Sequence, residues 1–99
     1  MKRYTRQQDH RTVIDESEIT RHDDHTVSGP AIDQLSRCED FLTLIQNERD
    51  AVIAEMNRLR ERNQTKSVRF RELFISKLVY ANIEAQLAHC GLSDHPKEP

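Results

Sequence analysis

Apolar residues in the middle of the chain recur every three or four positions, the spacing that aligns them on one face of a helix. Pro30 opens this segment, and proline is favoured at the first helical position, with Gly29 or Ser28 as the cap. We therefore expect a helix over about residues 30–62 with a coiled-coil-like seam that one arginine interrupts. The seam residues are Leu35, Cys38, Leu42, Ile45, Arg49, Val52, Met56 and Leu59.

A polar run over residues 60–67 follows this segment. Continuing the same seam beyond it leads to Lys77 and Glu84, whereas the apolar residues follow a stripe one position later. A slip in phase inside a polar run indicates that the helix is interrupted there. The shifted stripe consists of Phe74, Leu78, Ala81, Ala85 and Ala88.

The interruption predicts a turn near residues 63–66. Asn63 suits the left-handed conformation that ends a helix, and Thr65 or Ser67 suits the cap of the next one. The alternative is a single helical rod of about 60 residues, roughly 90 Å long at 1.5 Å per residue.

The second helix is expected over about residues 67–90, and its end is well marked. Gly91 provides the left-handed position, Leu92 can fold back on Leu87, and Pro96 follows. A second apolar row lies about 100° from the shifted stripe, so one partner helix cannot cover both. This row, which we expect to bind a partner, consists of Ile75, Val79, Ile83 and Leu87.

The termini are polar. Residues 1–29 are expected to be a largely disordered segment, and residues 93–99 a disordered tail. A weaker alternative pairs residues 12–14 with residues 26–27 as two short strands, because both contain β-branched side chains. The predicted fold class is all-α: an antiparallel two-helix hairpin that can dimerise into a four-helix bundle.

The composition indicates how this hairpin is stabilised and in which compartment it occurs. The 99 residues are 35% hydrophobic and 32% charged, and they include no Trp. We therefore expect a small hydrophobic core and a fold that is stabilised by self-association or by a partner. No apolar run suits a secretory signal or a membrane span, which favours the cytoplasm. In that reducing compartment the two cysteines, Cys38 and Cys90, are expected to remain thiols.

Charge is unevenly spread. Residues 58–77 hold seven basic and two acidic side chains, a net charge of +5, whereas residues 30–57 hold two basic and six acidic, a net charge of -4. A basic cluster at the turn could neutralise phosphates, or it could be a solvated hairpin end. The candidate phosphate-binding residues are Arg58, Arg62, Lys66, Arg69 and Arg71.

Other reactive side chains are candidates for catalysis or metal binding. Cys38 and Cys90 are equally distant from Gln64, so packing, a redox clip and a zinc site with His89 stay open. The segment His22–His25 favours a solvated linker over a metal site. With only two glycines and no catalytic motif, we expect no enzyme activity, no catalytic residue, no metal and no cofactor.

These patterns predict a non-enzymatic protein-protein interaction module, such as a helical adaptor, a chaperone-like protein or an inhibitor. The expected partner is a second copy of the chain, another protein, or both, with no membrane or small-molecule substrate. The alternative is a nucleic-acid-associated regulator that uses the basic turn.

Overall fold

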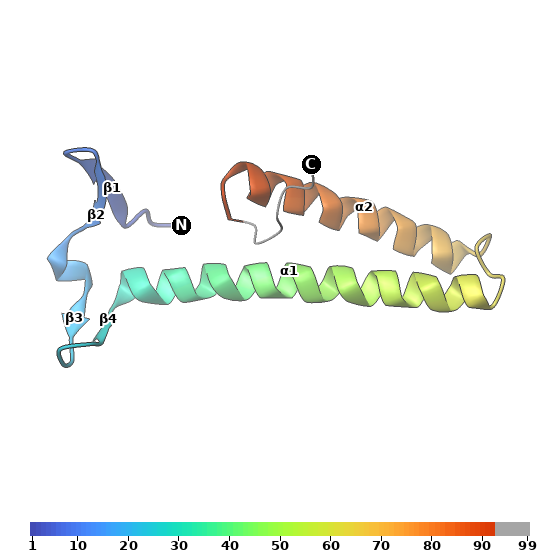
Figure 1. The fold of residues 1–99 in the computed structure, drawn as a ribbon, viewed down its shortest axis with the longest axis horizontal. Helices are drawn as coiled ribbons and strands as arrows, with labels where there is room; N and C mark the ends of the chain where they lie inside the picture. The colour runs from blue at the N-terminus through green and yellow to red at the C-terminus, as the bar shows by residue number, and fades with distance from the viewer. Residues whose placement is uncertain (93–99) are drawn as a thin grey trace. The chain divides into compact units, whose positions relative to one another are not determined.

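The computed structural model describes residues 1–92, and they form strands as well as helices (Figure 1). The fold is mixed α+β, so the all-α prediction is wrong, although its helix-helix packing is present. The tail predicted at 93–99 lies outside the described residues. The chain divides within its first long helix into an N-terminal unit, Met1–Asp40, and a C-terminal unit, Phe41–Pro99.

Two antiparallel hairpins occupy the N-terminal segment that was expected to be disordered. In the first, β1 (Thr5–Gln8) pairs with β2 (Arg11–Ile14) across Asp9 and His10, both with positive φ. That is the backbone of a two-residue turn matched to strand twist, here built without the glycine that usually signals it. In the second, β3 (Thr20–Arg21) pairs with β4 (Val27–Ser28).

The alternative strand pairing is also wrong, because residues 12–14 and residue 27 belong to different hairpins. In both hairpins, polar side-chain contacts take the place of apolar packing. Gln7 Nε2 donates to Thr12 Oγ1 across the first hairpin at 2.8 Å. In the second, the Asp23 carboxylate accepts from the backbone N–H of His25 and of Thr26, which holds the pKa of Asp23 below its ordinary value of 3.8.

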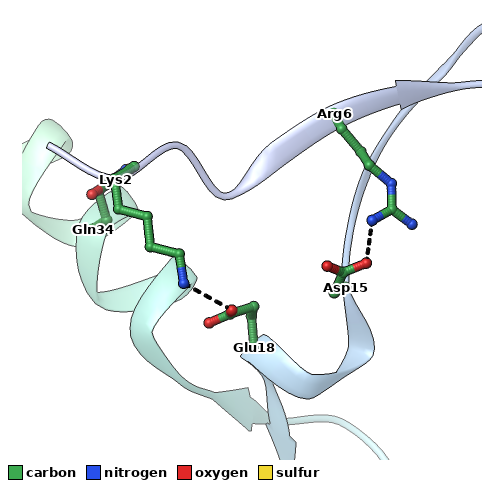
Figure 2. Close-up of polar contacts among 5 residues, drawn as sticks. All are labelled: Lys2, Arg6, Asp15, Glu18 and Gln34. Atoms are coloured by element: carbon green, nitrogen blue, oxygen red, sulfur yellow. Dashed lines mark hydrogen bonds and ion pairs between the residues drawn. The ribbon is translucent and has the colours of Figure 1, made fainter.

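Ion pairs connect separate segments of the N-terminal unit (Figure 2). Lys2 Nζ lies 3.0 Å from Glu18 Oε1, and Arg6 pairs with Asp15. The backbone carbonyl of Lys2 accepts a hydrogen bond from Gln34 Nε2 at 2.9 Å, which ties the N-terminus to the first helix. A short 3-10 helix, η1 (Glu16–Glu18), connects the two hairpins.

The two long helices are α1 (Pro30–Glu61) and α2 (Val68–His89), where helices were expected over about 30–62 and 67–90. The turn between them excludes the single rod. Asn63 has φ 57°, and Ser67 Oγ accepts from the Phe70 backbone N–H at 3.0 Å, which confirms both residues in their predicted roles.

The end of α2 is also as predicted. Gly91 has φ 77°, and the Leu92 N–H donates to the Leu87 carbonyl at 2.8 Å. The N–H of Gly91 donates to the Ala88 carbonyl, which completes a Schellman motif. Local hydrogen-bond chemistry therefore sets the bounds of the hairpin.

In the C-terminal unit α2 runs back along α1 (Figure 1). Among the described residues the buried apolar side chains are Ile45, Met56 and Leu73. The packed face of α2, which we term the inner seam, continues the heptad phase of α1 and does not slip. It consists of Phe70, Leu73, Lys77, Tyr80, Glu84 and Leu87.

The predicted phase slip is therefore wrong as a guide to packing. Most of the shifted stripe, including Phe74 and Leu78, is exposed. Glu84 is accommodated inside because Arg49, the polar residue of the α1 seam, pairs with it at 2.7 Å. The guanidinium of Arg49 on α1 thus compensates the charge of the Glu84 carboxylate on α2.

Candidate partner-binding surface

A second heptad series runs along the side of α2 that faces away from α1. We term it the outer seam, and each of its members is exposed. It lies two positions before the inner seam, which corresponds to about 200° of rotation at 3.6 residues per turn. The outer seam consists of Val68, Arg71, Ile75, Leu78, Asn82 and Ala85.

Large apolar side chains gather in the middle of this seam. Ile75 is 55% exposed and Leu78 is 54% exposed, and they are flanked by Phe74 at 46% and Val79 at 52%. Four such side chains over about two helical turns form a contiguous strip, which is unlike the single exposed apolar residues common on protein surfaces.

The strip carries no charge. Between Glu72 and Glu84 the only charged side chain is Lys77, and it is half-buried on the inner seam. Centres of protein interfaces are depleted of charged residues in the same way, because desolvating an unpaired charge is costly. The composition of this strip is therefore that of a docking surface.

The predicted partner-binding residues divide between the two faces. Ile75 and Val79 are exposed as a docking role requires, whereas Ile83 and Leu87 are half-buried. Phe74 and Leu78 belong to the surface, although the apolar pattern of the sequence predicts them in the packed stripe. One signal in the sequence does indicate which face of α2 packs on α1. It is the opposite charges of Arg49 and Glu84, which can form an ion pair between the two helices.

Comparison with known proteins does not extend this description. No family model, curated protein or solved structure matches the chain. The role of the surface must therefore be inferred from its own chemistry.

The basic turn is partly neutralised by its neighbours. Arg69 donates from Nε and Nη2 to both carboxylate oxygens of Glu55, at 3.0 and 2.9 Å. That hydrogen bonding lowers the pKa of Glu55 and raises the pKa of Arg69. Arg60 lies over the Phe70 ring, 5.3 Å from its centroid, and donates to Asn57.

Other basic side chains at the turn are exposed to solvent. Arg62 and Lys66 are exposed and form no side-chain hydrogen bond or ion pair within residues 1–92. Of the five candidate phosphate-binding residues, Arg69 is therefore committed to α1, whereas the other four are exposed.

The other candidate sites are not assembled among the described residues. Cys38 and Cys90 are both exposed free thiols. Within residues 1–92 no group of three or more His, Cys, Asp or Glu side chains is arranged to hold a metal ion. In the same range, neither long helix combines the length and apolar character needed to cross a membrane.

Proposed function

We propose that the chain is a non-enzymatic protein-protein interaction module that binds a partner helix along the outer seam of α2. The observation that carries this proposal is the uncharged strip formed by Phe74, Ile75, Leu78 and Val79, each about half exposed. Covering such side chains contributes on the order of 1 kcal/mol apiece, enough together to hold a helix in place.

The role is that of an adaptor, a chaperone-like protein or an inhibitor, because each of these acts by occupying a partner's surface. We place this activity in the cytoplasm, since two exposed cysteines that remain unpaired are typical of a reducing compartment.

The proposal is tested by placing a charge within the strip. Val79→Glu should lower both the molar mass in solution and the capture of cross-linked partner proteins, because a carboxylate would be desolvated in the contact. Ala54→Glu is the matched control: Ala54 is exposed on α1 and lies two positions before buried Met56, on the opposite side of that helix.

Circular dichroism should show unchanged helix content in both variants, because both sites are exposed. If Val79→Glu leaves both the molar mass and partner capture unchanged, the outer seam is not a docking surface and the proposal is wrong.

A second candidate function is binding of a polyanion such as nucleic acid at the turn. The accessible charges of Arg62 and Lys66 favour it. Fluorescence anisotropy with a labelled oligonucleotide should show affinity that falls steeply with salt. The double variant Arg62→Gln/Lys66→Gln should weaken binding, whereas Arg37→Gln should not. Absent or salt-independent binding would exclude this function.

A further inference from the structure

The outer seam becomes self-complementary when one copy of α2 is reversed against another. If the numbers of seam residues that face each other sum to 153, Ile75 meets the second copy's Leu78. Phe74 and Val79 flank the seam on opposite sides, so across the two-fold axis each of them approaches the same residue of the second copy. Farther out, Val68 meets Ala85, and Arg71 meets Asn82. In antiparallel helix pairs, alternate seam positions meet in this way.

We propose that the outer seam binds a second copy of this chain in antiparallel orientation, an inference that rests on the proposed function. The two-fold axis passes between the two α2 helices at the level of Ser76 and Lys77. Each of the four apolar side chains of the strip then covers another, and both copies use the same surface patch, as a closed two-fold dimer requires.

Charge selects the antiparallel arrangement over the parallel one. A parallel pair would place Arg71 against the second copy's Arg71 within the seam, and it would bring both basic turns to the same end. Like charges that face each other in a contact are destabilising. Reversal separates the turns and sets the Arg71 guanidinium, a donor, against the Asn82 side-chain carbonyl, an acceptor.

The contact spans 18 residues, about 27 Å at 1.5 Å per residue. A single helix pair of that length is at the small end of specific interfaces, so we expect dissociation in the micromolar range.

The test combines a concentration series with two substitutions at one exposed position. Light scattering of the full chain from about 1 µM to 1 mM should show a transition from monomer to dimer mass. Asn82→Glu adds two ion pairs with Arg71 to an antiparallel dimer and should tighten it about fivefold. Asn82→Lys adds two repulsions and should loosen it by a similar factor.

A parallel dimer would respond differently, because residue 82 would then face residue 82. Both substitutions would introduce like charges and both would loosen the dimer, which would overturn the antiparallel arrangement. No response to either variant would also overturn it, since residue 82 would then lie outside the contact. Both replacements favour helix, so loss of the fold is not expected to obscure the result.

A monomer at every concentration would overturn the second copy as the occupant. The proposed function would then be decided separately by whether Val79→Glu loses capture of a different protein. Failure of this inference and failure of the proposed function are therefore distinguishable.

Discussion

Arg49 of α1 and Glu84 of α2 form an ion pair across the helical hairpin, with Nη1 donating to Oε2 at 2.7 Å. Both side chains are largely buried, at 21% and 19% exposure. The other oxygen of this carboxylate, Oε1, is buried and accepts no hydrogen bond within residues 1–92. The pair therefore sets which residues face each other more than it adds stability.

This arrangement predicts different results for single and double substitution. Arg49→Met should lower the free energy of unfolding by about 1–3 kcal/mol, because Glu84 keeps its charge in a largely buried site. Arg49→Met/Glu84→Met should recover most of that loss. Urea denaturation of both variants measures the difference. Additive losses in the double variant would show that the two side chains do not interact.

The buried contact between α1 and α2 and the exposed outer seam of α2 predict different sensitivities to truncation. Met56 is 1% exposed, so Met56→Ala should cost about 2–4 kcal/mol through the cavity that it leaves. Leu78→Ala, at an exposed position, should change the unfolding free energy of the monomer by less than about 0.5 kcal/mol. Thermal unfolding in dilute solution compares them. A larger loss for Leu78→Ala than for Met56→Ala would show that the outer seam, and not the inner seam, packs against α1.

Glu55 predicts a pH dependence of stability. The hydrogen bond from Arg69 holds the pKa of Glu55 below its ordinary value of 4.5. Stability from this pair is therefore complete above about pH 4.5 and is lost as the pH falls through the lower pKa of the folded state. Arg69→Gln should flatten that part of the acid unfolding profile, and Arg62→Gln should leave it unchanged.

Gly29 predicts a strict requirement for glycine. Its φ is +142°, and a Cβ atom there would overlap the Glu18 carbonyl oxygen and approach the Cα of Ile19 to 3.0 Å. Gly29→Ala should therefore displace β3 and β4, seen as faster exchange of the His22 amide, which donates to the Thr26 carbonyl at 3.0 Å.

Gly91 provides the comparison for that substitution, since it also has positive φ but its Cβ would meet nothing within 4 Å. Gly91→Ala should cost only about 1 kcal/mol of backbone strain at the end of α2. Equal effects at both positions would mean that contact with Glu18 does not matter.

The positions of the helices were predictable because local chemistry decides them. Proline at residue 30, the hydroxyl of Ser67 and the left-handed positions at Asn63 and Gly91 act within one turn of the chain. The apolar spacing of α1 likewise identified Ile45 and Met56, which are buried.

The hairpins of the N-terminal segment were not predictable on the same basis. Their strands are polar, and the first turn uses Asp9 and His10 where glycine is usual. Strand pairing and contacts between distant residues, such as Lys2 with Glu18, hold them together. Apolar periodicity does not report such contacts.

By itself the sequence determined where α1 and α2 begin and end, and that α2 has more apolar surface than one helix can cover. Only the tertiary structure decided which face of α2 turns inward. The physical reason is that Glu84 is tolerated in the contact because Arg49, 35 positions earlier, meets it there. That choice leaves Ile75 and Leu78 exposed on the outer seam.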